Sequence, residues 1–145
     1  MKIKGKTMLS RSEKKCLLAR SPRFDDAFTG LTAASKIPKG LVRESRQVVA
    51  LARKFNDEVV RPYTRALDIK MHEDPEFLPY EFVSAANEWG FYTMWIPRIF
   101  GGQGYNMPSM SIFVEEIGSA CLTMANLIGV HYLGVATLCA TWNVG

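Results

Sequence analysis

The chain has little cysteine and little histidine. Its 145 residues include three cysteines, Cys16, Cys121 and Cys139, and two histidines, His72 and His131. The cysteines are too few and too widely spaced to form a disulfide framework or a CxxC metal knuckle. Because the two histidines also lie far apart in the sequence, we predict no metal site.

Acidic residues are scarce in the N-terminal third of the chain, so the positive net charge comes from that segment. The chain carries 18 Lys and Arg against 14 Asp and Glu, a net charge of +4. Residues 1–46 hold twelve of the basic residues and only four of the acids, so residues 47–145 are net acidic. Because the basic excess does not extend over the body of the chain, we predict no nucleic-acid partner.

Residues 1–40 lack a sustained helical stripe of apolar residues and are interrupted by Gly and Pro. We predict that they form a basic, partly ordered N-terminal extension. A mitochondrial transit peptide would explain the basic residues, but Glu13, Asp25 and Asp26 argue against one. No apolar stretch follows Met1, which excludes a secretory signal. We therefore expect a cytoplasmic protein, with the mitochondrial matrix as the alternative.

Strand patterns are absent from residues 41–145, whereas helical periodicity is clear. From Val48 to Val59 the apolar residues recur in steps of three and four, which predicts one amphipathic helix. We expect Pro62 to kink this helix or to end it near Arg61, because proline lacks an N–H and clashes with the preceding turn.

Prolines and glycines divide the rest of the chain. Helices are predicted to begin at Pro79 and at Pro108, because proline is tolerated in the first helical turn. The first of these helices is expected to end at Gly90, which suits a left-handed C-terminal cap. The connection over residues 91–107 is expected to be irregular, and Thr123 is a candidate N-cap for the last helix. The predicted fold class is all-α, with four or five packed antiparallel helices.

Charge is missing altogether from the last 29 residues, 117–145. This length is enough to span a bilayer, which needs about 20 apolar residues. Polar residues and glycines are spread along the segment and no Lys/Arg cluster closes it, so we favour a buried helix and no membrane span. A small membrane protein anchored by residues 117–142 is the alternative. Few helices are present to surround such a helix, so we expect a homo-oligomer or another association through its exposed surface.

No catalytic constellation can be assembled from the residues alone. The glycine loop, residues 101–104, follows no strand and precedes no Gly-Lys-Ser/Thr, so tight turns are favoured over a phosphate cradle. Glu115 and Glu116 project about 100° apart on a helix. One is therefore expected to face solvent and the other to pair with a basic residue of a neighbouring element. His131 is expected to be a satisfied core histidine.

Four short motifs follow one another along the chain. They are Glu-Val-Val-Arg-Pro at 58–62, Glu-Trp-Gly-Phe at 88–91, Pro-Arg-Ile-Phe-Gly-Gly-Gln-Gly at 97–104 and Glu-Glu-Ile at 115–117. In this order and spacing they resemble the N-terminal helical domain of the flavin-dependent acyl-CoA dehydrogenases. The resemblance covers about 90 of the 145 residues. Arg98 departs from it, because the family commonly has an acid there.

The resemblance implies that residues 41–145 are this N-terminal domain. The middle β-domain and the C-terminal helical domain, which supply the flavin site and the catalytic glutamate in the family, are then absent from this chain. The complete enzyme would use FAD, an acyl-CoA substrate and an electron-transfer partner for α,β-dehydrogenation. We expect the chain alone to be inactive and to bind no FAD tightly, and its cofactor-binding residues stay unknown. A non-catalytic helical interaction module is the alternative.

The resemblance also implies a substrate-binding surface on the last helix. Counted from Glu115 and Glu116, the wall of the acyl pocket falls at Ala125, Gly129 and Leu133, whose spacing of four places them on one helix face. Ala125 and Gly129 are small, so we expect the complete enzyme to accept long or bulky acyl groups over very short ones.

Overall fold

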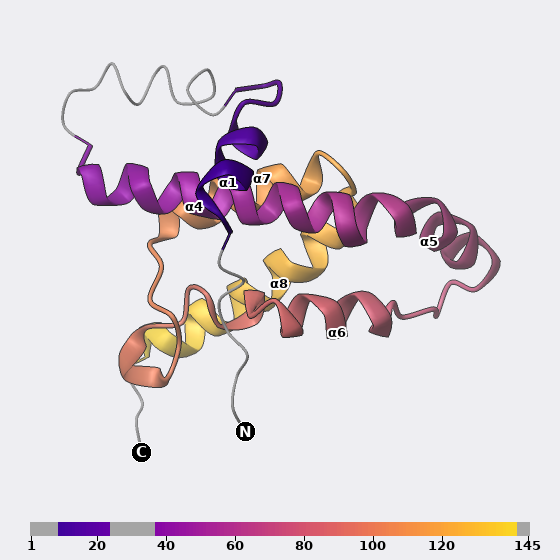
Figure 1. Cartoon of the computed structure of the whole chain (residues 1–145). Coiled ribbons are helices and arrows are strands. Elements are labelled where there is room, and N and C mark those ends of the chain that lie inside the picture. Colours follow the sequence, from indigo (N-terminus) through magenta and orange to yellow (C-terminus); the bar gives the residue numbers. More distant parts are fainter. Residues whose placement is uncertain (1–8, 24–36, 142–145) are drawn as a thin grey trace.

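The computed structural model describes residues 9–23 and 37–141, and these residues contain no strand (Figure 1). Their α-helices are α1 (Arg11–Leu18), α4 (Lys39–Phe55), α5 (Arg61–Glu73), α6 (Tyr80–Glu88), α7 (Met107–Gly118) and α8 (Leu122–Ala140). A π-helical turn, η1 (Asn56–Val60), joins α4 to α5, and the 3-10 turns are η2 (Phe91–Thr93) and η3 (Arg98–Phe100). The predicted all-α fold class is confirmed.

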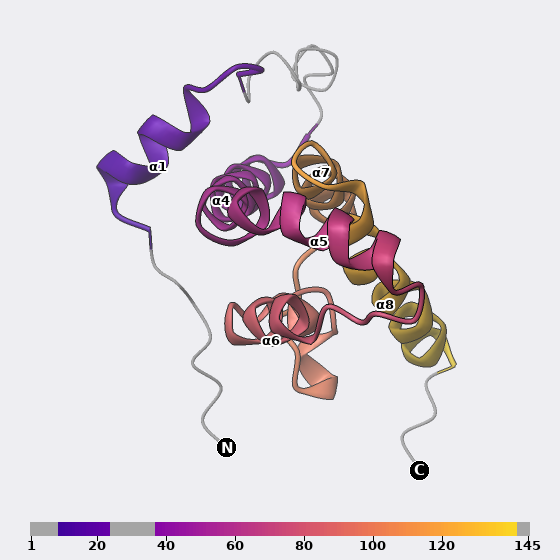
Figure 2. The same cartoon turned by 90° about the vertical axis from the view of Figure 1, so that its right-hand side faces the viewer.

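Aromatic rings form the centre of the core. Helix α4 packs mainly against α7, α7 packs against α8, and α6 and α8 both contact η2 (Figures 1 and 2). Phe55 of α4 lies 4.9 Å from Phe91 of η2, which in turn lies 4.8 Å from Phe113 of α7, measured between ring centroids. Edge-to-face pairs of this kind add stabilisation beyond the area they bury. These three fully buried rings therefore join α4, η2 and α7.

The predicted break near Arg61 is a change of helix type and not the end of the helical path. The π-turn η1 ends at Val60, and α5 begins at Arg61 with Pro62 in its first turn. Proline has no N–H, so its place in the first turn leaves no donor without a partner. The π-turn before it widens the backbone at the point where the proline ring would clash with a regular helix. Thr64 Oγ1 donates to the carbonyl of Val60 at 2.8 Å, which occupies one acceptor there.

Several predicted helix boundaries are confirmed and one is wrong. Pro79 is the N-cap of α6, Pro108 lies in the first turn of α7, and Gly90 after α6 has a left-handed φ of 76°. Thr123 is not the N-cap of α8. Cys121 is, with extended backbone and no side-chain cap, because the chain reverses directly after α7 and α8 starts at once.

Helix α1 lies within the predicted N-terminal extension and packs on α4. Ser10 and Glu13 form a capping box at its start, and Leu17 is buried. The helix is only eight residues long, and Leu17 and Leu18 are its only large aliphatic residues, so its apolar face is too short to give a periodic signal.

Arg53 of α4 connects α1 to α7 from a buried position. Its Nη1 donates to the carbonyl of Leu17 at 2.7 Å, and its Nη2 donates to the carbonyl of Pro22 at 2.7 Å. Its Nε lies 3.1 Å from Oε1 of Glu116, and only 6% of the Arg53 side chain is exposed. Glu116 is thus the acid that pairs across the interface and Glu115 is the exposed one, as predicted for this adjacent pair.

Two further ion pairs fasten α1 and the residues after it. Lys54 Nζ lies 2.7 Å from Glu13, and Arg20 lies 2.6 Å from Asp57. The hydrogen bond from Lys54 holds the pKa of Glu13 below its ordinary value, and the same bond raises the pKa of Lys54. Both pairs are partly exposed, so each stabilises the contact only modestly.

Helix α4 also holds the first turn of α7. The carboxylate of Glu44 accepts hydrogen bonds from the backbone N–H and the side-chain Nδ2 of Asn106, at 2.7 and 2.9 Å, and from Ser109 Oγ at 2.7 Å. At the other end of α7, Asn56 Nδ2 donates to the carbonyl of Glu116 at 2.7 Å. The α4–α7 contact is therefore fixed at both ends by polar groups as well as by the aromatic core.

We predict that Glu116→Ala lowers the free energy of unfolding by about 2–3 kcal/mol, because it leaves the buried guanidinium of Arg53 without its counter-charge. The matched control is Glu115→Ala at the neighbouring exposed position, which should change stability by less than about 0.5 kcal/mol. Urea unfolding followed by circular dichroism measures both. Equal effects of the two substitutions would contradict the role given to the Arg53–Glu116 pair.

Candidate functional site

Helix α8 has one buried side and one exposed apolar side. The buried side carries Met124, Ala125, Ile128 and Tyr132. The exposed apolar side, called here the α8 outer face, carries Leu122, Gly129, Val130 and Leu133. Leu122 and Leu133 are 78% and 69% exposed, which is high for leucine in the longest helix of a folded domain.

By length and composition α8 would be able to cross a membrane, but 22% of its most apolar window is buried inside the chain. Core helices of other proteins meet the same criterion. The predicted burial of this helix is therefore found on one side only, and its other side is exposed in the part of the chain that the structure describes.

The structure places the three predicted pocket residues on successive turns of α8, at different depths. Ala125 is 1% exposed and lies close to α7, since a Cβ added to Gly118 would be 3.6 Å from the Cβ of Ala125. Gly129 is half-buried, and a Cβ added to it would meet no atom within 4 Å. Leu133 lies fully on the outer face. The three residues thus form a strip that runs from the core to the surface.

A second side of α8 borders a groove that the sequence did not indicate. The groove has a volume of about 740 Å³ and is lined by Tyr80, Val83, Ser84, Asn87, Tyr92, Leu127 and His131. Nε2 of His131 lies 3.2 Å from the carbonyl oxygen of Tyr92, and the two rings meet edge to face. His131 is therefore a half-buried and hydrogen-bonded histidine. The groove that His131 borders is formed where α6 packs near α8, and no local sequence signal predicts it.

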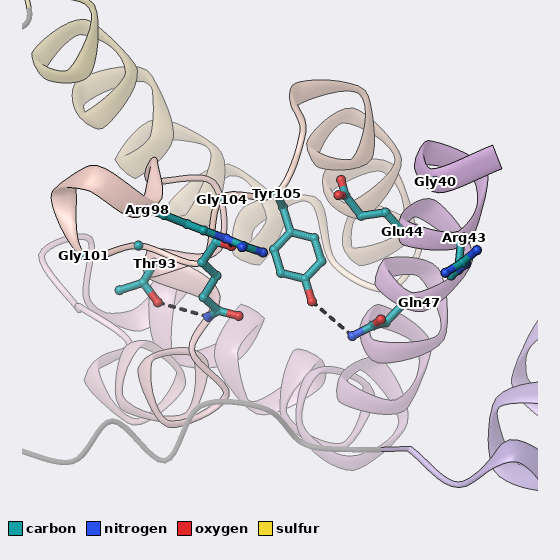
Figure 3. Close-up of a pocket in the computed structure, with 11 residues that line it drawn as sticks. Gly40, Arg43, Glu44, Gln47, Thr93, Arg98, Gly101, Gly104 and Tyr105 are labelled. Carbon is teal, nitrogen blue, oxygen red and sulfur yellow. Dashed lines mark hydrogen bonds between the residues drawn. The ribbon is translucent and has the colours of Figure 1, made fainter. Parts of the chain in front are cut away.

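The glycine loop borders a polar pocket of about 510 Å³ between η3 and the first turns of α4 (Figure 3). Arg98 and Tyr105 come from the loop region, and Arg43 and Gln47 come from α4 (Figure 3). Gln47 Nε2 donates to the hydroxyl of Tyr105 at 3.1 Å, which links the two walls. Burial, and then the charge of Glu44, raises the pKa of Tyr105 above its ordinary value.

The backbone amides of the glycine loop are all used within the loop region. Those of residues 101 to 104 donate, in order, to the carbonyls of Arg98, Pro97, Thr93 and Ile96. Gly101 and Gly104 have φ values of 82° and 70°, and a Cβ on Gly102 would overlap the carbonyl of Ile96. Tight turns therefore account for the loop, as predicted. No amide is left for the pyrophosphate of a flavin, so the loop does not fit that group.

Tyr132 of α8 and Trp95, which follows η2, carry buried polar groups. Their rings meet edge to face at 4.6 Å, and neither the Tyr132 hydroxyl nor Trp95 Nε1 has a hydrogen-bond partner among the residues of 9–23 and 37–141. Burial raises the pKa of Tyr132 far above its ordinary value, so the hydroxyl stays neutral. Within the same residues no group of three His, Cys, Asp or Glu lies close enough to hold a metal ion.

The described residues form a helical domain with an exposed apolar face on α8. The family model of the acyl-CoA dehydrogenase N-terminal domain matches residues 43–142. The chain therefore belongs to the acyl-CoA dehydrogenase family, through its N-terminal domain. The match leaves α1 outside the family domain.

Individual relatives agree with this assignment. The chain is 32% identical over 88 residues to (2S)-methylsuccinyl-CoA dehydrogenase of Cereibacter sphaeroides, which covers 61% of this chain and 15% of the relative. It is 26% identical over 92 residues to isobutyryl-CoA dehydrogenase of Dictyostelium discoideum, covering 63% of this chain and 21% of that protein. It is 28% identical over 101 residues to a short-chain acyl-CoA dehydrogenase of Clostridium acetobutylicum, covering 70% and 24%. No solved structure matches.

The chain thus spans less than a quarter of the length of the curated relatives it matches.

We predict that the 145-residue chain self-associates in solution through the α8 outer face, because that face exposes several large apolar side chains together. Leu133→Glu should shift the molar mass measured by static light scattering toward the monomer. Ser111→Glu adds the same charge at an exposed position of α7 and serves as the control. A wild-type chain that stays monomeric at high concentration without detergent would contradict the prediction.

Proposed function

We propose that this chain supplies the N-terminal helical domain of a flavin-dependent acyl-CoA dehydrogenase, an enzyme that introduces a double bond between the α and β carbons of an acyl-CoA thioester. The family match over residues 43–142 supports the proposal. So do the names of three of the relatives, which are dehydrogenases of CoA thioesters. A fourth relative, of Anaerotignum propionicum, is named as an acryloyl-CoA reductase that uses NADH. On this proposal the chain alone is inactive. In the complete enzyme, the two electrons removed from the acyl group would pass by way of the flavin to a separate electron-transfer partner.

The α8 outer face is the single observation that carries the domain's role. It is apolar and uncharged, and in the described residues nothing covers it. We assign Gly129 and Leu133 of this face to the surface of the acyl pocket, and Ala125, which is buried beside α7 one turn before Gly129, to the layer of the wall behind them. The remaining walls would be contributed from outside the described residues. Such a wall removes water from the acyl chain and holds it in one orientation, which is the share of catalysis that an apolar surface can supply.

The flavin supplies the hydride acceptor in the complete enzyme, and the described residues offer no set that would hold it. The glycine loop, the segment whose composition suggested a phosphate cradle, has no free amide. We therefore assign no residue of this chain to FAD and derive no chemical step through it.

A helical interaction module without catalysis would expose the same face of α8. The two functions differ in what completes that face: a flavin enzyme in one case and an unrelated partner in the other. The cytoplasmic location stays a prediction, with the mitochondrial matrix as its alternative.

The chain alone is predicted to bind no FAD with submicromolar affinity. Isothermal titration of FAD into residues 1–145 measures this, and a complete acyl-CoA dehydrogenase that contains this domain is the positive control. Tight binding by the isolated chain would show that its own residues form a flavin site, against the assignment above.

We predict that Gly129→Leu in the complete enzyme shifts substrate preference toward shorter acyl chains. A Cβ added at this position meets no atom within 4 Å, and leucine favours a helix more than glycine does, so the substitution is expected to fill space beside the helix without unfolding it. Each excluded methylene costs about 0.8 kcal/mol, so two of them lower the kcat/KM ratio of long over short acyl-CoA by at least about tenfold.

Gly134→Leu is the matched control for this prediction. Gly134 lies on the same helix and also has no atom within 4 Å of an added Cβ, but it faces away from the Ala125–Gly129 strip. It should leave the kcat/KM ratio unchanged. If both variants, or neither, change the ratio, Gly129 has no place in the pocket wall, although the family assignment stands.

A further inference from the structure

The groove between α6 and α8 takes no part in the proposed function. Helix α6 lines it with Tyr80, Val83, Ser84 and Asn87, whose spacing of three and four residues places them on one face of the helix. The groove volume of about 740 Å³ lies within the range of small-molecule sites. It is therefore large enough for an aromatic compound.

The groove lies on the opposite side of α8 from the residues assigned to the acyl pocket. Leu127 and His131 are the α8 residues that line it. Each lies two positions from Gly129, and two positions turn an α-helix by about 200°. A ligand in the groove is therefore separate from a substrate in the acyl pocket.

The protein core holds the walls of the groove in place. On the other face of α6, Phe82 and Ala86 are buried, and the ring centroid of Phe82 lies 5.7 Å from that of Phe55. The turn η2 contacts both α6 and α8 and supplies Tyr92 to the groove. Because these walls are already fixed, little conformational freedom is lost when a ligand binds, which favours affinity.

Aromatic rings and aliphatic side chains form most of the groove surface. Tyr80 is 71% exposed, so its ring is open to a ligand, and Tyr92, Val83 and Leu127 are half-buried. Aromatic rings pack favourably against one another, edge to face or offset. No Asp, Glu, Lys or Arg is found among the described residues that line the groove. The lining therefore favours an aromatic ligand without charge.

His131 adds a directional hydrogen-bonding group to the groove. Its Nε2 lies 3.2 Å from the carbonyl oxygen of Tyr92, which can only accept a hydrogen bond, so Nε2 carries the proton. In the neutral imidazole the other ring nitrogen, Nδ1, is then an acceptor. No residue in the described part of the chain donates a hydrogen bond to Nδ1. His131 can therefore accept a hydrogen bond from a ligand.

We propose that this groove binds a small neutral aromatic compound that carries an N–H or O–H donor, such as an indole or a phenol. The ring packs against Tyr80 and Tyr92, and Nδ1 of His131 accepts the hydrogen bond from the donor. Ser84 and Asn87 are exposed and can bind a second polar group on the ring. The site does not rest on the proposed dehydrogenase function, so the failure of one leaves the other standing.

Indole is the probe, titrated into the isotope-labelled 145-residue chain and followed by the backbone amide signals in NMR spectra. The titrations are made at slightly alkaline pH, where imidazole groups are neutral. We expect saturable shifts of the signals of residues that line the groove. N-methylindole has the same ring without the N–H and should bind about fivefold more weakly, because one hydrogen bond is lost.

Two substitutions in the groove test the roles given to its residues. His131→Gln keeps a donor for the carbonyl of Tyr92 and removes the imidazole acceptor, so it should weaken indole binding about fivefold and change N-methylindole binding less than about twofold. Ser84→Phe fills the groove and should abolish the binding of both compounds. Its matched control is Ser111→Phe, at an exposed serine of α7 outside the groove, which should change either affinity less than about twofold.

The proposal is overturned if indole shows no saturable binding or if indole and N-methylindole bind equally well to the unmodified chain. It is also overturned if Ser111→Phe weakens binding as much as Ser84→Phe does. Shifts confined to the α8 outer face would contradict it as well, since they would show adsorption to an exposed apolar surface and not binding in the groove.

Discussion

The buried guanidinium of Arg53 is the interaction on which the arrangement of this domain depends. A charge taken out of water destabilises a fold unless hydrogen bonds and a counter-charge replace its hydration. Arg53 gains both, from the end of α1 on one side and from Glu116 of α7 on the other. One side chain of α4 therefore sets the position of α1 and of α7 together. Helix α8 then packs against α7 and η2 through its own buried side.

The exposed face of α8 follows from the small number of helices around it. The helix is uncharged on every side, yet α7 and η2 are the elements it mainly contacts, and they cover only one side. Membership of the acyl-CoA dehydrogenase family gives this imbalance a reason, since relatives are several times longer than the matched segment. An apolar face that is costly for a lone chain is favourable as a wall against another part of an enzyme.

The pocket beside the glycine loop contains Glu44, whose carboxylate accepts hydrogen bonds from the backbone and side chain of Asn106 and from Ser109. A charged side chain that lines this pocket therefore serves mainly to hold the first turn of α7 against α4.

Local chemistry was readable in the sequence, because it depends on neighbours in the chain. Proline and glycine marked the starts of α6 and α7 and the left-handed residue Gly90, and apolar periodicity showed α4. The adjacency of Glu115 and Glu116 was enough to predict that they face different surroundings. Spacing alone placed Ala125, Gly129 and Leu133 on one face. It did not show their depth, which runs from buried to exposed because α7 covers only part of that face. The docking of α1 on α4 depends on residues that are far apart in the sequence. So does the pairing of Arg53 with Glu116 and not with Glu115. Only the tertiary structure decided these features, because their energies come from burial and from partners that no local pattern specifies.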